Sequence, residues 1–441
     1  MATATWADSV EVPRAARLHG TPALPGDKSI SHRALLLALL ARGHSRITGA
    51  SRGDDVRTTR ALTERLGARV RERIDTLEID AEGVDSLDDP GPSPIDCRNS
   101  GTTMRLTAGI LAGQPFPAVL DGDESLRTRP MRRVVEPLRA MGADVSPTDA
   151  GTPPLRIRGR RPLRAIDWSP TVASAQVKSA ILLAGLRADG TTRVHEPVPT
   201  RDHTERMLRA RGVDVRVTGD GAGGSIVEIG GGQVVAPHDE LVPGDGSAAA
   251  FWLVAGACHP DARIDLTRVG VNPGRRGALD ILREMGATIS ERPHPIPDGG
   301  EPIADLRVMS SELRAVDVDA RRAVDAIDEI PVLCLAATQA RGVSVFRGLG
   351  ELRVKESDRL AGIVEGLTAF GARVALDGDD VRVTGPTALA GVTVDGHGDH
   401  RLVMTFAIAG LLASGITTIS GAASVAISDP GFLIELERIR A

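Results

Sequence analysis

A five-residue signature recurs along this chain, and it restricts the possible folds more than any other feature. In each copy a glycine follows a helical pattern of apolar residues and precedes a strand-like pattern. A glycine in that position is typical of the left-handed residue that ends a helix. The copies are spaced by about 70 to 85 residues, which indicates a repeated supersecondary unit rather than one continuous core. The glycines are Gly67, Gly142, Gly212, Gly286 and Gly371.

A second helix belongs to each unit and is rich in Ala and Leu almost all round. Such a helix has no polar face to expose, so we expect it to be buried. Six copies are present, at residues 33–40, 103–111, 175–184, 248–257, 332–337 and 402–412.

Strand-like runs alternate with these helices, as at residues 45–48, 192–195, 263–266, 343–346 and 416–419. The alternation predicts an α/β (α+β) protein of six βαβαββ repeats, in which sheets cover the buried helices. A length of 441 residues exceeds what one core usually organises. We therefore predict two domains of three repeats each: residues 25–241, and residues 1–24 together with 242–441, with a hinge near 24 and 242.

Composition excludes several classes of protein. The net charge of −5, the 2% of aromatic residues and the absence of Tyr argue against a nucleic-acid partner. No apolar run approaches the roughly 18 residues that a membrane span needs, and no secretory signal is apparent. Three cysteines are too few and too dispersed for a disulfide framework or a zinc site, and His397 and His400 have no clear third ligand. We expect a cytoplasmic protein without a metal.

Polar residues stand immediately before the buried helices. Gly, Ser, Thr, Asp and Asn in these places favour helix starts. A helix N-terminus carries unpaired N–H groups and about half a positive charge, which suits phosphate or carboxylate. Several such ends facing one cleft would concentrate positive potential there.

Four segments add ionic groups to these helix starts. They are Leu24–Arg33, Asn99–Arg105 with the Asp121–Pro130 loop, Arg353–Arg359, and Asp399–Arg401. Lys355 and Arg359 are four residues apart, and two cations on one helical face repel unless they share an anion. Lysine occurs only at positions 28, 178 and 355 among 53 basic residues, so each Lys is informative.

The ordered motifs resemble those of the 5-enolpyruvylshikimate-3-phosphate synthases, in the second microbial subclass. The matching stretches are LPGDKSISHRALLLALLA, NSGTTMRL, RTRPM, SAQVKSA, RDHTERM, DEIPVLCLAA, RVKESDRL and GDHRLVM. The resemblance implies a two-domain inside-out barrel that closes around substrate. It also implies transfer of the enolpyruvyl group of phosphoenolpyruvate to the 5-hydroxyl of shikimate 3-phosphate, in a monomer that needs no cofactor.

The resemblance implies roles for individual residues. Asp328 would accept the hydroxyl proton, while Glu356 and Lys28 would handle proton traffic at the vinyl carbon. Gly101 would leave room for the inhibitor glyphosate. The expected contacts to shikimate 3-phosphate are Lys28, Ser29, Arg33, Ser174, Ala175, Gln176, Thr200, Asp328 and Lys355. The expected contacts to phosphoenolpyruvate are Lys28, Gly101, Arg129, Gln176, Arg359 and Arg401.

The chain departs from the family pattern at several positions. Ala175 removes a hydroxyl donor, for which Lys178 could compensate, and His203 replaces an aromatic partner of the ring. Glu351 stands where the family has Asn. Near the C-terminus, Ile427, Ser428 and Asp429 replace a run that often contains Lys.

Other functions remain open from the sequence. A related transferase acting on UDP-N-acetylglucosamine would have a reactive Cys in the loop 121–130, and none is there. An enolpyruvyl transferase of specialised metabolism with another alcohol acceptor is the main alternative. A non-catalytic anion-binding protein or an RNA-end-processing relative is less compatible with Asp328, Glu356 and the three lysines.

Overall fold

The computed structural model describes residues 8–296 and 300–440 and divides the chain into two compact units. The first unit contains residues 8–27, 243–295 and 302–440. The second unit contains residues 28–242 and the described part of 296–301. The chain therefore passes between the units four times, and the repeat pattern did not indicate that residues 296, 300 and 301 belong to the second unit.

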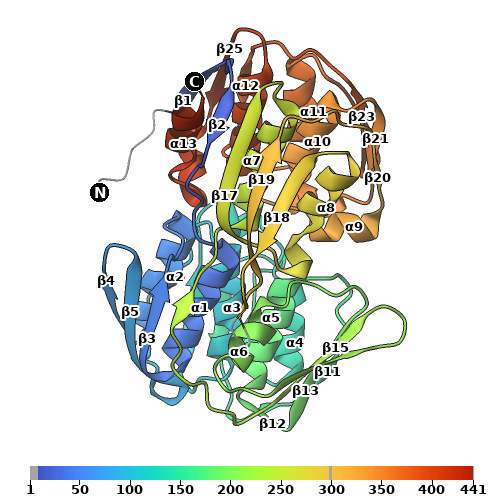
Figure 1. Ribbon diagram of the computed structural model, residues 1–441. Coiled ribbons are helices and arrows are strands. Elements are labelled where there is room, and N and C mark those ends of the chain that lie inside the picture. Colours follow the sequence, from blue (N-terminus) through green and yellow to red (C-terminus); the bar gives the residue numbers. More distant parts are fainter. Residues whose placement is uncertain (1–7, 297–299, 441) are drawn as a thin grey trace. The chain divides into compact units, whose positions relative to one another are not determined.

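Three helices form the interior of the second unit: α1 (Lys28–Leu40), α3 (Gly101–Ala112) and α5 (Ala175–Gly185). Figure 1 shows β3, β5 and β4 on the outer side of α1 and α2, and β11, β13 and β15 on the outer side of α4 and α5. The predicted burial is confirmed, because every residue of α1 from Ile30 to Leu40 is buried. The second layer of helices is α2 (Asp54–Arg65), α4 (Arg132–Ala140) and α6 (His203–Arg209).

Two of these interior helices touch through a glycine. A Cβ built on Gly109 of α3 would lie 2.2 Å from the carbonyl oxygen of Ala180 in α5. Such an approach leaves no room for any side chain at position 109, so the glycine permits the close packing of α3 and α5.

The three four-stranded sheets of the second unit share one strand pattern, and a further sheet is a parallel pair of β10 (Leu163–Arg164) and β12 (Ala188–Asp189). In each four-stranded sheet, a short strand pairs in parallel with a longer strand, and that longer strand pairs with an antiparallel hairpin. The first sheet is β16 (Glu240–Leu241), β3 (Arg42–Thr48), β5 (Thr76–Glu82) and β4 (Arg69–Glu72). The second is β6 (Ile95–Asp96), β7 (Pro117–Asp121), β9 (Leu155–Arg158) and β8 (Asp144–Ser146). The third is β11 (Asp167–Trp168), β13 (Thr191–Glu196), β15 (Ser225–Gly230) and β14 (Val215–Gly219).

The first unit is built in the same way around α7 (Gly246–Cys258), α10 (Ile330–Gln339) and α12 (His400–Leu412). Two of its sheets are four-stranded. The first contains β18 (Thr288–Pro293), β19 (Ile303–Met309), β17 (Ala262–Gly270) and β2 (Leu18–Gly20). The second contains β20 (Asp317–Val318), β21 (Gly342–Phe346), β23 (Asp380–Gly385) and β22 (Arg373–Asp377). The third is β1 (Ser9–Pro13), β25 (Ile416–Ser420) and β24 (Thr393–Asp395). The outer helices are α8 (Gly277–Glu284), α9 (Ala320–Asp325), α11 (Arg359–Ala369) and α13 (Phe432–Ile439).

The local predictions are confirmed with small corrections. The five signature glycines all have φ between +77° and +106°. Five of the six interior helices begin earlier than predicted, for example at Lys28 rather than 33, because the polar residues of the first turn do not extend the apolar run. The glycines at 219, 221 and 224 belong to the β14–β15 hairpin. No helix among residues 8–296 and 300–440 combines the length and apolarity that a bilayer crossing requires.

Candidate active site

Three helix starts of the first unit meet in one ionic cluster. Asp245 precedes α7 and its side chain accepts from the Ser247 amide at 2.8 Å. The Ser247 hydroxyl contacts Glu329, which precedes α10. Arg401 in the first turn of α12 donates to the same hydroxyl at 2.6 Å and lies 3.6 Å from the Glu329 carboxylate. The N-termini of all three interior helices are thereby linked through side chains.

Two of the predicted acid–base residues, Asp328 and Glu356, lie at the edge of this cluster, whereas Lys28 belongs to the second unit. Asp328 is 18% exposed at its side chain, and its Oδ1 lies 3.7 Å from Lys355 Nζ and 3.6 Å from Arg359 Nη1. Arg359, the first residue of α11, also pairs with Glu356 and Asp399. Lys355 and Arg359 therefore share an anion. They do not share the helical face expected from their spacing, because Lys355 precedes α11, which begins at Arg359. Glu329 is the N-cap residue of α10, but its side chain makes no capping hydrogen bond to the helix. Asp328 and Glu329 are therefore not explained as a helix cap alone.

Electrostatics keep Arg359 and Asp399 ionised. Burial opposes the charge of Arg359, but Asp399 and Glu356 outweigh it and raise the pKa of the guanidinium above its ordinary value. Burial likewise opposes ionisation of Asp399, and the Arg359 guanidinium nevertheless lowers the pKa of that carboxyl. The cluster consequently presents fixed cations beside carboxylates, the arrangement expected of a site for an anionic ligand.

Helix starts also meet in the second unit. Ser100 and Ser174 are the N-cap residues of α3 and α5, and each side chain accepts from the amide three residues on. Gln176 joins the two starts, because its Nε2 donates to the Thr102 hydroxyl at 2.9 Å while its Oε1 accepts from Arg105 at 2.7 Å. Gly101 begins α3, and a Cβ there would lie 2.8 Å from Arg105 Nη1 and 3.5 Å from Arg129 Nη1.

The other predicted contacts of this unit come from α1 and two loops. Lys28 and Ser29 begin α1, and Lys28 Nζ lies 3.1 Å from Asp55 Oδ2. Arg129 Nη2 donates to Asn99 Oδ1 at 2.6 Å. Thr200 lies in the loop between β13 and α6 and contacts Glu196.

Arg33 occupies a more enclosed position than its expected role suggested. It is 3% exposed and donates to the Thr204 hydroxyl, the Ser29 carbonyl and the Ser179 hydroxyl, at 2.7, 2.9 and 2.8 Å. Burial, together with the charges of Lys28 and Arg33, lowers the pKa of the neighbouring His32 well below its ordinary value. His32 is therefore neutral at physiological pH, and the positive charge at this end of α1 comes from Lys28 and Arg33.

Two expectations from the sequence are wrong. Lys178 does not compensate for the hydroxyl lost at Ala175, because it is buried in ion pairs with Glu196 and Glu205. His203 does not stand open as a partner for a substrate ring, because it is 1% exposed and its Nδ1 lies 2.8 Å from Glu301 Oε1. In both cases a carboxylate distant in the sequence binds the side chain.

Some charged residues of the two clusters were missed or underrated. Arg275, in the helical turn after β17, lies 2.9 Å from Asp245 and 3.7 Å from Glu329, and these pairs raise its pKa against the opposing effect of burial. Asp55, the partner of Lys28, was also missed. Nothing in the sequence around Arg275 or Asp55 distinguishes it from a surface charge, so no sequence signal could have found either residue.

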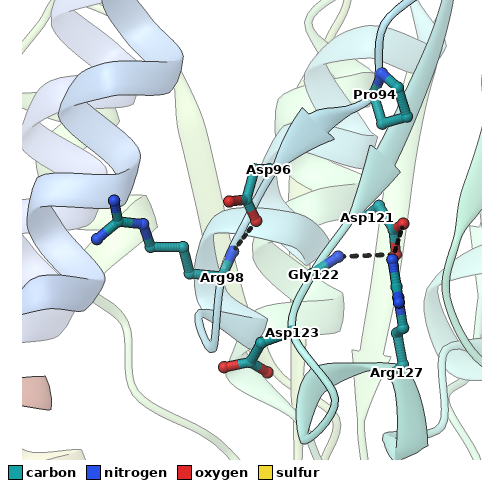
Figure 2. A pocket seen from close by; sticks show the side chains of 7 residues that line it. All are labelled: Pro94, Asp96, Arg98, Asp121, Gly122, Asp123 and Arg127. Atoms are coloured by element: carbon teal, nitrogen blue, oxygen red, sulfur yellow. Dashed lines mark hydrogen bonds and ion pairs between the residues drawn. The ribbon is translucent and has the colours of Figure 1, made fainter.

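A separate pocket of about 320 Å³ lies beside the start of α3 and holds none of the predicted site residues. Figure 2 shows Arg127 turned toward Asp121, while the Arg98 guanidinium points away from that pair. Arg127 donates to Asp121 Oδ1 at 2.9 Å, which fits a structural ion pair. No group of three or more His, Cys, Asp or Glu side chains that could hold a metal ion occurs within the described ranges 8–296 and 300–440.

Comparison with known proteins identifies the family. The model of the EPSP synthase family (3-phosphoshikimate 1-carboxyvinyltransferase) matches residues 12–436. The chain belongs to the EPSP synthase family. Curated 3-phosphoshikimate 1-carboxyvinyltransferases of Xanthomonas oryzae pv. oryzae are 50% identical over 420 residues, covering 95% of this chain and 94% of the relative. That of Xanthomonas axonopodis pv. citri is 48% identical over the same length.

Solved structures agree with the EPSP synthase assignment. The EPSP synthase of Acinetobacter baumannii superimposes with a TM-score of 0.86 at 39% identity, covering 98% of both chains. The enolpyruvyl transferase NikO of Streptomyces tendae has the same fold, with a TM-score of 0.77 at 19% identity, covering 97% of this chain and 96% of its own. Among the alternatives left open by the sequence, these comparisons favour EPSP synthesis.

Proposed function

We propose that this protein, as an EPSP synthase, transfers the enolpyruvyl group of phosphoenolpyruvate to the 5-hydroxyl of shikimate 3-phosphate and releases phosphate. The observation that carries the proposal is the cluster at the starts of α7, α10 and α12. There Lys355 and Arg359 lie beside Asp328, Arg359 also pairs with Glu356, and Arg401 lies beside Glu329. Both substrates carry phosphate and carboxylate groups, which such cations and helix ends stabilise.

The reaction needs proton transfer in both directions. The 5-hydroxyl oxygen attacks C2 of phosphoenolpyruvate, the hydroxyl proton passes to a base, and the C3 methylene takes a proton from an acid. The resulting tetrahedral adduct then loses a proton from C3 as its C2–O bond to phosphate breaks. We assign the base to Asp328 and the proton exchange at C3 to Glu356 and Lys28.

Substrate contacts divide between two sets. For shikimate 3-phosphate we propose Lys28, Ser29, Arg33, Ser174, Ala175, Gln176, Thr200, Asp328 and Lys355. For phosphoenolpyruvate we propose Lys28, Gly101, Gln176, Arg129, Arg359 and Arg401. The ion pairs and hydrogen bonds given above support these assignments, because they hold the charged side chains in place before substrate arrives.

We propose further that the fold is an inside-out barrel of six βαβαββ repeats, three in each of two domains. The strand pattern common to the sheets supports this description. We expect a cytoplasmic monomer that works on these two small molecules without nucleic acid, membrane, metal or organic cofactor.

Phosphate release from phosphoenolpyruvate tests the proposal, measured with and without shikimate 3-phosphate. The expected result is release that depends on the acceptor and is abolished in an Asp328→Asn variant. Absence of release from folded protein with both substrates present would refute the proposed function.

A further inference from the structure

Three charged side chains form an enclosed ionic group in the second unit, away from solvent. Lys178 Nζ lies 2.8 Å from Glu196 Oε2 and 2.7 Å from Glu205 Oε1. The side chains of Lys178, Glu196 and Glu205 are 2%, 4% and 1% exposed. Burying charges so completely costs several kcal/mol per ion unless the partners are well placed, so such a group points to a specific requirement.

The ammonium of Lys178 finds three acceptors, one for each of its three protons. Besides the two carboxylates, it donates to the Thr200 carbonyl oxygen at 3.4 Å. An ammonium suits three acceptors around one point, whereas a guanidinium spreads five donors over a planar fork. The chain has only three lysines among 53 basic residues. The presence of one of them at position 178 is consistent with a need for three acceptors around one nitrogen.

Glu196 extends the group to the loop that precedes α6. One oxygen of Glu196 accepts from the Thr200 amide at 3.2 Å and contacts the Thr200 hydroxyl. Its other oxygen accepts from the Ser225 hydroxyl at 3.2 Å. Amide, hydroxyl and carbonyl of Thr200 are thus all bound to the Lys178–Glu196 pair.

The neighbouring residue of α5 completes the attachment. The Ser179 hydroxyl lies 2.7 Å from the Thr204 hydroxyl, and both hydroxyls accept from Arg33. Consecutive residues of one buried helix therefore hold Thr200 and Thr204, the latter in α6, and connect them to Arg33.

We propose that Lys178 and Glu196 act as a buried ionic clamp that positions Thr200, and the loop around it, for binding shikimate 3-phosphate. The role of Thr200 in this inference rests on the proposed function. The two clamp members are positioning residues, because they touch the loop and not the reacting atoms. Glu196 carries the contacts to the loop, while Glu205 balances the charge of Lys178.

Two isosteric variants separate these roles. Glu196→Gln weakens the bonds to the loop, and we expect it to raise the KM for shikimate 3-phosphate about tenfold, since a hydrogen bond to a charged group contributes about 1.5 kcal/mol or more. The kcat and the KM for phosphoenolpyruvate should stay within about twofold. Glu205→Gln is the matched control, which keeps every bond to Thr200 and should change KM by less than about twofold. A clamp that serves folding alone would lower the melting temperature of both variants and leave KM unchanged, which would overturn the proposal.

Hydrogen–deuterium exchange of the intact protein gives a readout independent of activity. Peptides covering residues 197–202 should exchange about tenfold faster in Glu196→Gln and at the wild-type rate in Glu205→Gln. Equal rates in both variants would contradict the clamp. If the wild type releases no phosphate, the proposed function fails, and this exchange experiment still decides whether the loop is clamped.

Two further variants test the clamp independently of Glu196→Gln. Should Glu196→Gln not fold, Ser225→Ala removes one bond to Glu196 and should change exchange in the same direction. Lys178→Arg should behave like Glu196→Gln, because the planar fork cannot meet the same three acceptors. Wild-type KM and exchange in Lys178→Arg would contradict the argument from the ammonium.

Discussion

Arg359 donates through Nε to Oδ2 of Asp399 at 2.7 Å, although 40 residues separate them in the chain. Their side chains are 1% and 0% exposed. Asp399 is also the N-cap residue of α12 and accepts from the Arg401 amide at 2.9 Å. One carboxylate therefore fixes the guanidinium of Arg359 and the backbone of Arg401 together.

Replacing Arg359 by Lys should weaken the binding of phosphoenolpyruvate. Three different nitrogens of the planar fork face the three carboxylates: Nε faces Asp399, Nη2 faces Glu356 and Nη1 faces Asp328. The single nitrogen of an ammonium cannot occupy these three places, so we expect the KM for phosphoenolpyruvate to rise about thirtyfold, for a loss of about 2 kcal/mol. Steady-state kinetics with varied phosphoenolpyruvate measure the effect. Arg353→Lys is the control, because Arg353 is exposed and pairs with Asp379 and Asp358. A similar KM change in both variants would contradict the assignment.

Asp328→Asn should lower kcat by about 10² to 10⁴, the usual contribution of a general base, with smaller changes in either KM. An amide keeps the shape of the side chain but does not accept the hydroxyl proton. Rates of phosphate release at saturating substrates test this, with circular dichroism to verify folding. A kcat within about threefold of the wild type would remove Asp328 from the mechanism.

Gly101→Ala should crowd the expected phosphoenolpyruvate contacts. The added methyl would lie 2.8 Å from Arg105 Nη1, so that flexible side chain must shift. We expect glyphosate to inhibit the wild type in competition with phosphoenolpyruvate, and the alanine variant to show weaker inhibition and a higher KM for phosphoenolpyruvate. Inhibition constants for the two proteins decide the question, and equal constants would argue against the placement of Gly101.

Asp429→Asn should stabilise the protein above neutral pH. Burial first, and then the nearby carboxylates of Asp245 and Glu435, raise the pKa of Asp429 to about 7. Its Oδ2 is buried without a hydrogen-bond partner among the described residues. Below about pH 4 the side chain is protonated in the folded and unfolded states alike. Between about pH 4 and 7 only the unfolded state ionises, so the wild type loses roughly 4 kcal/mol over that interval.

The difference in unfolding free energy between Asp429→Asn and the wild type should therefore grow from pH 5 to pH 8. Urea unfolding at several pH values measures this difference. Asp395→Asn is the control of opposite sign, because bonds from His397 and Ser420 lower the pKa of Asp395. The stabilising effect of the Asp395 carboxylate is lost only as the pH falls below the ordinary pKa of an aspartate. The difference in unfolding free energy between Asp395→Asn and the wild type should therefore show no trend from pH 5 to 8. A flat difference for Asp429→Asn would contradict the assigned pKa.

Much of the fold was accessible from local patterns. The apolar run of α7 predicted a buried helix because nearly every position around its axis is Ala, Phe, Trp, Leu or Val. The signature glycines predicted helix ends because a side chain is penalised at positive φ. Lys355 and Arg359 do meet one carboxylate, that of Asp328, but not through a shared helical turn, because Lys355 lies before the start of α11.

The errors concern partners that are distant in sequence. Lys178 and His203 look like candidate ligand contacts in the sequence, but Glu205 and Glu301 bind them in the interior. Arg275 lies 30 residues from Asp245 and 54 residues from Glu329, and nothing between them signals that they meet.

By itself the sequence determined the interior helices, their polar starts and the family, because each depends on residue types within a few positions or on an ordered set of motifs. Only the tertiary structure decided which charge faces which. An ion pair forms when two side chains are brought within about 4 Å, and that distance depends on how whole helices pack rather than on the residues beside either partner. The same packing converts Lys178 from an apparent ligand contact into part of a buried clamp.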